Sequence, residues 1–425
     1  MNLFSKSSYS AALFLAACLF GSCSKKNSPN PANTQLTIAS LSTDHGPFNS
    51  VVTINGTGFS NTPSNDVVSF NGKAATVTAA TSTQITAMVP VGAGTGKISL
   101  SVNGVNVTGP TFTYELTATV TTLAGNMSPG KKDGTGANAS FNDPYAIAAD
   151  AAGNIYVVDM GNQLIRKVTP AGVVTTLAGS GSPGANNGTG TSASFNYPSG
   201  ITVDAAGNVY VADTDNKLIR KITPTGVVTT LAGSGTSGST DGTGAAASFQ
   251  DPLGLTIDNV GNIYAVDGNS LRMITPAGVV STLGGPFDEP LGVVYFNGNL
   301  FFSDADKNTI NQFKESAATV IAGSGSKGAI NGTGLAASFS FPSGITADPS
   351  GNIYVTDTNN GLIRMITPGG VVTTLAGGAT GVFAEIDGVG TGAGFDAPSG
   401  ITIDSAGNLY VSDANGNEIR KIVLK

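Results

Sequence analysis

Histidine, cysteine and tryptophan are almost missing from this chain of 425 residues, which holds one histidine, two cysteines and no tryptophan. Both cysteines, Cys18 and Cys23, lie near the start, so the body of the protein has neither a disulfide nor a thiol nucleophile. His45 stands in an Asp-His-Gly-Pro loop segment, where we expect it to face solvent. These absences exclude Cys-His and Ser-His catalysis from most of the chain, because the nucleophile or its base is missing.

Charge is also scarce, at 11% of residues with a net charge of −7. The basic residues form no cluster beyond Lys25-Lys26 and Lys131-Lys132. Because phosphate contacts supply most non-specific affinity for nucleic acids, we predict no nucleic-acid partner. The 58 glycines and the Val-, Ile- and Thr-rich runs instead indicate many short strands joined by tight turns.

Residues 1–23 have the pattern of an export signal. One charge, at Lys6, precedes an apolar run that ends at Phe20 and is too short to span a membrane. The ending Phe-Gly-Ser-Cys resembles the lipobox of bacterial lipoproteins, in which the cysteine is acylated, although Phe20 stands where that family usually has leucine. We therefore predict a lipoprotein signal peptide over 1–23 and lipidation at Cys23. The alternative is a plain signal peptide cut nearby.

Residues 24–35, SKKNSPNPANTQ, are polar and contain proline, which is typical of a tether. Ser24 after the cysteine resembles an outer-membrane sorting signal, and Lys25-Lys26 lacks the acidic run of a surface-export signal. The chain is therefore expected in the cell envelope, held at the outer membrane by its lipid anchor. Periplasmic and surface-exposed orientations both stay open.

Residues 36–116 alternate apolar and polar residues over short runs separated by Gly and Asn turns, which predicts an antiparallel β-sandwich. The segment GPFNSVVTINGTGFS, followed by VSFNG, ITAMVP and GTGKISLSV, resembles the IPT/TIG immunoglobulin-like family. In that family the domain is usually a spacer or contact module without a catalytic site.

Six phenylalanines, each three residues before a proline, mark a repeat over residues 118–425. They recur at intervals of 54, 54, 38, 52 and 56 residues, so the fourth unit is short. The six are Phe141, Phe195, Phe249, Phe287, Phe339 and Phe395. Most units continue as P-x-G-I-x-x-D-x-x-G-N-I/V/L-Y-V-x-D and end in I-T-P-x-G-V-V-T-T-L-A-G, which resembles NHL repeats. A fixed period of this length indicates a repeat architecture. The predicted fold is all-β: an immunoglobulin-like β-sandwich followed by a six-bladed β-propeller.

Each unit predicts four strands, named a to d from the inside of the ring outward. The first d-type strand, Val120–Ala124, precedes the first a strand, and residue 425 follows the sixth c strand. We therefore expect this early strand to complete the sixth blade, which would leave no open sheet edge in the ring.

Residues that repeat in every unit predict scaffold. The Asx-Gly-Thr-Gly turns supply glycine for positive φ, and an Asp ending each b strand is expected to cap the b–c turn. The six phenylalanines are expected to be buried plugs beneath the long loops. The arginines of strand c are expected to lie against neighbouring backbone.

Function is expected where the repeats differ, on the face that carries the d–a loops of about twenty residues. Unit four loses this loop, which opens a notch in the rim, and unit six gains an apolar insertion around Phe383. The residues flanking the six prolines, at the mouth of the central channel, also differ between units. We predict a ligand site there, formed by Asp143, Tyr145, Tyr197, Asp251, Glu289 and Phe341.

Some propellers that resemble this family are enzymes: amidating and streptogramin lyases use histidines, and gluconolactonase-like enzymes use a divalent metal held by Glu, Asn and Asp. The propeller segment has no histidine or cysteine, so only a metal-dependent lactonase-like hydrolase stays open as an enzymatic alternative. We predict no cofactor, although the carboxylates of Asp143, Asp251 and Glu289 would suit Ca²⁺. The preferred function is a lipid-anchored envelope protein that binds an extracellular glycan or protein ligand. A non-catalytic scaffold is the other alternative.

Overall fold

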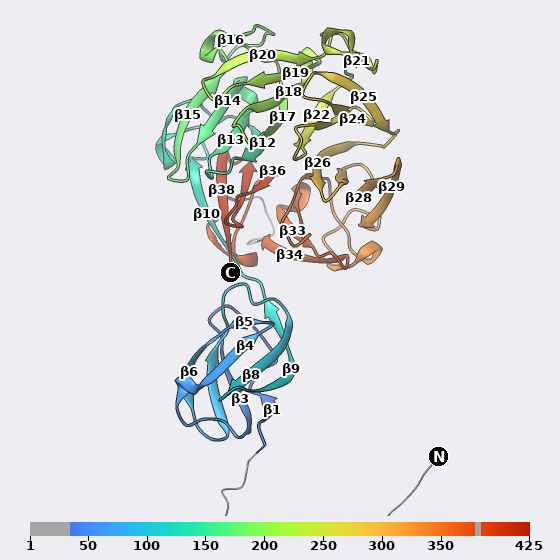
Figure 1. The fold of residues 1–425 in the computed structure, drawn as a ribbon. Coiled ribbons are helices and arrows are strands. Elements are labelled where there is room, and N and C mark those ends of the chain that lie inside the picture. The colour runs from blue at the N-terminus through green and yellow to red at the C-terminus, as the bar shows by residue number, and fades with distance from the viewer. Residues whose placement is uncertain (1–34, 379–383) are drawn as a thin grey trace, which may run out of the picture. The chain divides into compact units, whose positions relative to one another are not determined.

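The computed structural model describes residues 35–378 and 384–425, which divide into two compact all-β units (Figure 1). The first is a sandwich and the second a propeller of six blades, counted over the described residues. The described part of the chain contains no helix long and apolar enough to cross a membrane.

The sandwich consists of two sheets whose inward residues alternate with outward ones. Val52 and Ile54 are buried while Val51 is exposed, and the same alternation buries Val68 but not Val67. One sheet has the order β1 (Thr37–Leu41), β3 (Val51–Thr57), β7 (Gln84–Met88), β6 (Thr76–Ala80). The other has the order β2 (His45–Pro47), β9 (Val105–Glu115), β8 (Gly96–Val102), β4 (Asp66–Phe70), β5 (Lys73–Ala74), with the 3-10 turn η1 (Pro63–Asn65) before β4. The alternation has a period of two residues, as a sheet with one buried face requires. The predicted immunoglobulin-like sandwich is therefore confirmed.

Each blade is a sheet of four long antiparallel strands, numbered blade 1 to blade 6 along the chain. The innermost a strands are β12 (Pro144–Ala149), β17 (Pro198–Val203), β22 (Pro252–Ile257), β26 (Pro290–Phe296), β31 (Pro342–Ala347) and β36 (Pro398–Ile403). The b strands are β13 (Ile155–Asp159), β18 (Val209–Asp213), β23 (Ile263–Asp267), β27 (Asn299–Asp304), β32 (Ile353–Asp357) and β37 (Leu409–Asp413). The c strands are β14 (Leu164–Val168), β19 (Leu218–Ile222), β24 (Ser270–Ile274), β28 (Thr309–Lys314), β33 (Leu362–Ile366) and β38 (Glu418–Leu424). The outer d strands are β15 (Val173–Ala178), β20 (Val227–Ala232), β25 (Val279–Gly284), β29 (Ala317–Ala322), β34 (Val371–Gly377) and β10 (Ala118–Gly125).

The ring closes as the strand order predicted. β10 pairs with β38 from Ala118↔Leu424 to Gly125↔Glu418, so the first strand of the propeller completes blade 6 (Figure 1). The inner strands of neighbouring blades are also in contact all round, including β12 with β36. Closure therefore pairs both edges that an open ring would expose.

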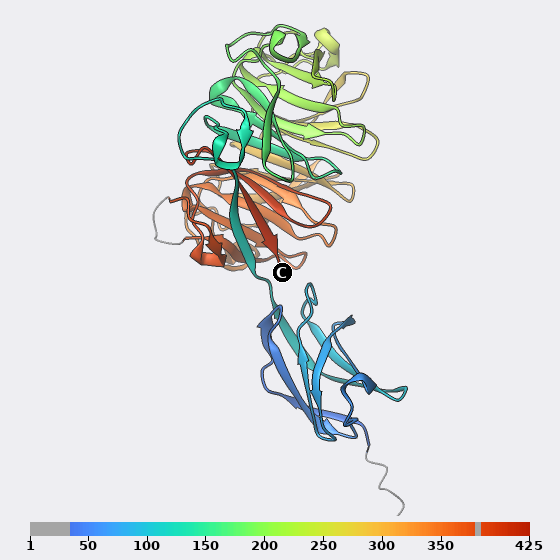
Figure 2. The same ribbon diagram turned by 90° about the vertical axis from the view of Figure 1, so that its left-hand side faces the viewer.

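The cores of the propeller lie between the sheets of neighbouring blades, and Figure 2 shows this ring of blades from the side. Between blades 1 and 2, for example, Tyr156 and Val158 of β13 pack against Phe195 and Val209. Five of the six repeated phenylalanines are fully or almost fully buried. Phe287, expected as a sixth plug, is only partly buried, because the shortened loop of blade 4 leaves one side of its ring uncovered.

Five of the long loops add a short fifth strand to the outer edge of their blade. These strands are β11 (Gly134–Thr135), β16 (Gly188–Thr189), β21 (Gly242–Thr243), β30 (Gly332–Thr333) and β35 (Gly388–Val389). Each is followed by a 3-10 turn: η2 (Gly136–Asn138), η4 (Gly190–Ser192), η6 (Gly244–Ala246), η7 (Gly334–Ala336) or η9 (Gly390–Gly392). The b–c connections carry η3 (Met160–Asn162), η5 (Thr214–Asn216) and η8 (Thr358–Asn360). Blade 4, described over its whole length, ends at its fourth strand, β29.

Candidate functional site

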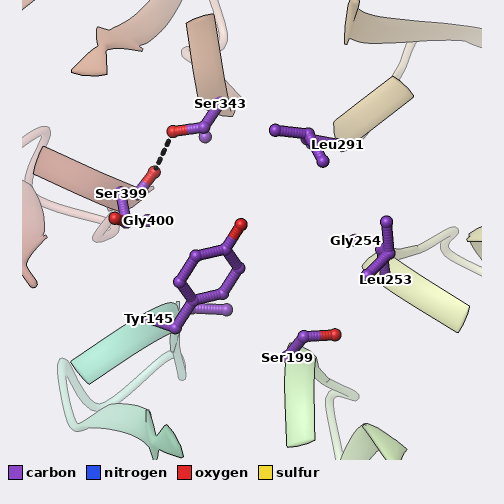
Figure 3. Close-up of a pocket in the computed structure, with 11 residues that line it drawn as sticks. Tyr145, Ser199, Leu253, Gly254, Leu291, Ser343, Ser399 and Gly400 are labelled. Atoms are coloured by element: carbon purple, nitrogen blue, oxygen red, sulfur yellow. Dashed lines mark hydrogen bonds between the residues drawn. The ribbon is translucent and has the colours of Figure 1, made fainter. Parts of the chain in front are cut away.

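The proline that starts each a strand places the next residue at the mouth of the central channel. These six residues are Tyr145, Ser199, Leu253, Leu291, Ser343 and Ser399, and they line a cavity of about 60 Å³ (Figure 3). The hydroxyl of Tyr145 points into the middle of this ring. Ser199 and Ser343 instead share hydrogen bonds with Thr214 and Thr358 of the b–c turns. Tyr145 is therefore the polar group that the ring presents to the cavity most directly.

Glycine explains why the channel is narrow. The second residue after the proline is glycine in five blades, and the carbonyl of the next blade lies against it. A Cβ atom on Gly200 would stand 1.9 Å from the Leu253 oxygen, and one on Gly344 would stand 2.3 Å from the Ser399 oxygen. Because the inner strands approach so closely, a cavity of this size holds a few water molecules and cannot enclose a sugar ring.

The residues before the prolines are held by the preceding blade. Asp143, Tyr197 and Phe341 all have positive φ angles between 52° and 56°. Their N–H groups donate to side chains of the b–c turn before them: Asn417 (3.0 Å), Gln163 (2.6 Å) and Asn308 (3.0 Å), respectively. In blade 3 the residue before the proline is Asp251, whose Oδ1 lies 2.6 Å from the Nζ of Lys217 in an ion pair. These turn residues were missed in the sequence, although they stand four residues after the Asp of strand b in four blades.

Electrostatics join three of the six predicted site residues. Burial raises the pKa of Tyr145 to about 12, and the charges of Asp143 and Glu289 add to the rise. Burial likewise raises the pKa of Asp143. The pKa of Glu289 is raised by burial first and then by the charge of Asp306 and a hydrogen bond to it. The phenol thus stays protonated at neutral pH beside two carboxyl groups.

Of the six predicted site residues, Tyr145 alone is among those that line this cavity, and Asp143, Tyr197, Asp251, Glu289 and Phe341 lie outside its lining. Tyr197 is 53% exposed, Phe341 is partly buried, and the Asp251 carboxylate is paired with Lys217. The part of all six residues in a ligand site stays a prediction. Phe383, Cys23 and the predicted signal peptide lie outside the described residues. The tether does too, except Gln35.

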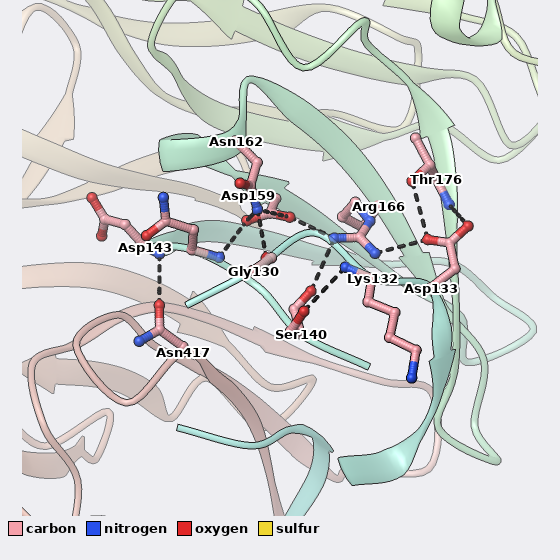
Figure 4. Close-up of polar contacts among 11 residues, drawn as sticks. Gly130, Lys132, Asp133, Ser140, Asp143, Asp159, Asn162, Arg166, Thr176 and Asn417 are labelled. Atoms are coloured by element: carbon pink, nitrogen blue, oxygen red, sulfur yellow. Dashed lines mark hydrogen bonds and ion pairs between the residues drawn. The ribbon is translucent and has the colours of Figure 1, made fainter. Parts of the chain in front are cut away.

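A buried arginine network repeats in the complete blades, as Figure 4 shows for blade 1. Arg166 of β14 donates to the carboxylate of Asp159 (2.6 Å), to Asp133 of the Asx-Gly-Thr-Gly turn (2.7 Å) and to the Ser140 carbonyl (3.2 Å). Burial raises the pKa of Asp159, while the Asn142 N–H, Asn162 and Arg166 oppose the rise. The arginines bind carboxylates as well as the backbone that was expected.

The Asp that ends strand b also differs from its expected role. In blade 1 its Oδ1 accepts the N–H of Asn142, in the d–a loop, at 2.8 Å. The same bond is made by the N–H of Asn196 and of Ser340 in blades 2 and 5. In these three blades the carboxylate therefore fastens the long loop, whereas in blade 4 Asp304 accepts the N–H of Lys307 in the b–c turn at 3.2 Å, as expected. Sequence alone could not show the contact with the long loop, because the loop residue is seventeen positions earlier in the chain.

Three cavities larger than the one at the channel mouth border blade 4. One of about 400 Å³ lies between the turns of blades 4 and 5, lined in part by Phe296, Phe301 and Pro349. A second, of about 290 Å³, adjoins Gly285 and Pro286 in the shortened loop, and a third, of about 370 Å³, includes Asp304. Each exceeds the cavity at the channel mouth several-fold. Among the described residues, no three His, Cys, Asp or Glu side chains are grouped so that they could hold a metal ion.

Residues 36–114 match the IPT/TIG domain, and residues 195–222 and 339–364 match the NHL repeat. The chain is an IPT/TIG domain followed by an NHL-repeat propeller. NHL repeat-containing protein 2 of Bos taurus is 29% identical over 294 residues, which is 66% of this chain and 38% of that protein. The chain thus corresponds to well under half of the curated relatives that it matches.

Solved structures share the two-domain fold. A protein of unknown function from Bacteroides thetaiotaomicron superposes with a TM-score of 0.62 at 23% identity, covering 93% of this chain and 99% of its own. An auxiliary nutrient binding protein from Bacteroides ovatus gives a TM-score of 0.58 at 18% identity, covering 92% and 98%. Identity at this level shows a common fold.

Proposed function

We propose that this protein is a lipid-anchored cell-envelope binding protein whose propeller binds an extracellular ligand, a glycan or a protein, on the face with the long loops. The observation that carries the proposal is the group of Asp143, Tyr145 and Glu289 at the channel mouth. On a sixfold scaffold, the charges of two unlike residues, Asp143 and Glu289, both act on the Tyr145 hydroxyl. The full proposed site also includes Tyr197, Asp251 and Phe341.

The chemistry of this group suits hydroxyl-bearing ligands. With its pKa raised, the Tyr145 hydroxyl stays protonated at neutral pH and can donate a hydrogen bond, and the carboxylates of Asp143 and Glu289 can accept one. A donor flanked by acceptors matches neighbouring hydroxyls of a sugar. Since the cavity measures about 60 Å³, only the tip of a ligand would enter, and the rest would lie on the surrounding loops.

The fold comparison supports a binding role. Auxiliary nutrient binding proteins of Bacteroides thetaiotaomicron and Bacteroides ovatus share the fold over 92% of this chain. By analogy of fold, capture of a nutrient outside the cell is the role that we propose here.

The test measures binding of the full chain, purified in detergent, to a glycan panel with and without Ca²⁺. The double variant Asp143→Asn/Glu289→Gln should weaken binding of any glycan found by about tenfold or more, because hydrogen bonds to charged groups are strong. Asp215→Asn is the matched control, since Asp215 is an exposed carboxylate in the b–c turn of blade 2. Wild-type affinity in the double variant would refute the proposed mouth site.

The anchor is tested separately. Cys23→Ala should move the protein from the membrane fraction to the soluble fraction or block its processing, because acylation needs the thiol. A wild-type protein that is already soluble in the periplasm or medium would refute the anchor.

A hydrolase of the lactonase type is a second candidate, favoured by one observation. Glu289 has a raised pKa and a hydrogen bond to Asp306, an arrangement that acid–base catalysis uses. Turnover of a lactone panel in the presence of Ca²⁺, lost in Glu289→Gln, would support the hydrolase over the binding protein.

A further inference from the structure

Five blades hold a guanidinium group in the same surroundings. The five arginines are Arg166, Arg220, Arg272, Arg364 and Arg420, and all are fully buried. Each donates to the Asp that ends strand b, at 2.6–3.2 Å. Each also lies over the ring of its blade's repeated phenylalanine, with Cζ 5.2–5.4 Å from the ring centroid. The protein thus contains five copies of an arginine site built from a carboxylate and an aromatic ring.

Blade 4 keeps the carboxylate and lacks the arginine. Asn311 pairs with Phe302 and Val320, just as Arg220 pairs with Val211 and Thr230 in blade 2. The buried Asp304 stands seven residues before Asn311, the same interval that separates Asp213 from Arg220.

A cavity lies where the complete blades hold the arginine and the long loop over it. It measures about 370 Å³, and both Asp304 and Asn311 line it. The hydrogen bonds to the Asp304 carboxylate come from the N–H groups of Lys307, Asp288 and Glu289, at 3.2–3.3 Å. No long loop covers this part of the described chain, since only residues 285–289 connect β25 to β26.

The rim of the cavity is acidic and apolar together. Asp288 lies on this rim. Lys307, the one lysine among the residues that line the cavity, places its Nζ 3.3 Å from Oδ2 of Asp288. Val320, 42% exposed, and Leu335, 64% exposed, give it an apolar edge, and the Phe287 ring adds an aromatic one. An aliphatic stem ending in a positive charge would contact both kinds of surface.

We propose that this cavity, defined by Asp304, Asn311, Phe287, Val320 and Leu335, binds the guanidinium group of an arginine side chain or a small guanidine from outside the protein. The group would take the place that the buried arginine has in the other five blades. A guanidinium fits better than an ammonium because it is planar, is weakly hydrated and donates through several N–H groups. This site shares no lining residue with the channel mouth, and its test does not depend on the mouth ligand.

Calorimetric titration of the full chain in detergent tests the proposal. The probes are agmatine, a free guanidine, and the peptide acetyl-Gly-Arg-Gly-amide, with acetyl-Gly-citrulline-Gly-amide as the uncharged isostere. We expect the guanidines to bind at least about tenfold more tightly than the citrulline peptide, because charge-assisted hydrogen bonds are about twice as strong as neutral ones. Binding of agmatine alone would identify free guanidines as ligands, and binding of the peptide alone would identify arginine in a polypeptide; either supports the site.

Two variants change the site in opposite ways. Asp304→Asn removes the charge and should weaken binding about tenfold or more. Asn311→Arg should supply the missing guanidinium internally, abolish binding and raise Tm; it keeps the test decisive if Asp304→Asn does not fold. Glu315→Gln is the matched control, an exposed carboxylate of blade 4 outside the lining of the cavity, and should have a much smaller effect. Equal binding of arginine and citrulline peptides, or wild-type binding by Asn311→Arg, would overturn the proposal.

Discussion

In blade 2, Arg220 lies fully buried between Asp213, Asn187 and the Ser194 carbonyl, and so ties the long loop to the sheet. At the same register position of blade 4 stands Asn311, and the loop is missing. Both blades nevertheless form four antiparallel strands of similar length. The strand ladders therefore do not need the arginine network. What the network holds is the loop that covers the outer half of the blade, and where it is absent a cavity opens.

The comparison also separates scaffold from candidate function. In the complete blades the buried arginine of strand c forms an ion pair with the buried carboxylate that ends strand b. Blade 4 leaves a buried carboxylate facing a cavity, and the neighbouring Glu289 carries a raised pKa. Groups available to an outside ligand thus gather at the one blade that departs from the repeat.

The largest expected effect is the loss of a network arginine. Arg220→Met leaves the buried Asp213 without its cation and should reduce the free energy of unfolding by about 3–5 kcal/mol. Asn311→Met in blade 4 should cost less than about 1 kcal/mol, since no buried charge loses a partner. Urea unfolding measures both. Equal losses would break the distinction between the two blades.

Loss of a repeated phenylalanine should likewise reduce the free energy of unfolding more in a complete blade than in blade 4. Phe195 is fully buried between two sheets, so Phe195→Ala should cost about 3–5 kcal/mol through lost burial and a cavity. Phe287→Ala should cost about half of that or less, because its ring is already partly exposed. The midpoints of denaturant unfolding of the two variants measure these losses. A smaller loss of stability in Phe195→Ala than in Phe287→Ala would contradict the burial argument.

A smaller effect is expected at the strand-b tyrosine. In blade 2 the Tyr210 hydroxyl donates to Asp204 at 3.1 Å, whereas blade 4 has Phe301 at this position. Tyr210→Phe should cost about 0.5–1.5 kcal/mol, the value of one hydrogen bond. Phe301→Tyr should give no gain, because the two-residue turn of blade 4 offers no carboxylate. The Tm of each variant, measured by thermal melting, tests both expectations.

The smallest effect concerns acid stability. Burial acts to raise the pKa of Asp204, but hydrogen bonds from Asn208, Tyr210 and Ala206 outweigh it, and the pKa is lowered. A pKa lower in the folded than in the unfolded state adds stability above about pH 4, and this is lost as pH falls further. Asp204→Asn should therefore reduce the loss of Tm between pH 4 and pH 2. An unchanged acid profile would contradict the assignment, and Asn297→Ala in the equivalent turn of blade 4 serves as the control without a carboxylate.

Much of the architecture follows from the sequence alone. The interval between repeated phenylalanines, the alternation in residues 36–116 and the early d strand predicted the sandwich, six blades and closure through blade 6. These predictions are correct because period and alternation are local, and each turn returns the chain into its own sheet. The predicted d strand Val120–Ala124 lies within the observed β10, Ala118–Gly125.

The site depended on contacts that no local pattern contains. Sequence placed Tyr145 and Glu289 near the channel mouth, but Asp306 reaches Glu289 from another turn, and Gln163 fixes the backbone of Tyr197 from the preceding blade. The partly exposed ring of Phe287 and the cavity beside the Asp304 carboxylate likewise result from a loop that is missing. Sequence determined how many blades form and how they close, because that information repeats along the chain. Only the tertiary structure decided which side chains meet, because side-chain direction at a blade edge is set by the neighbouring blade.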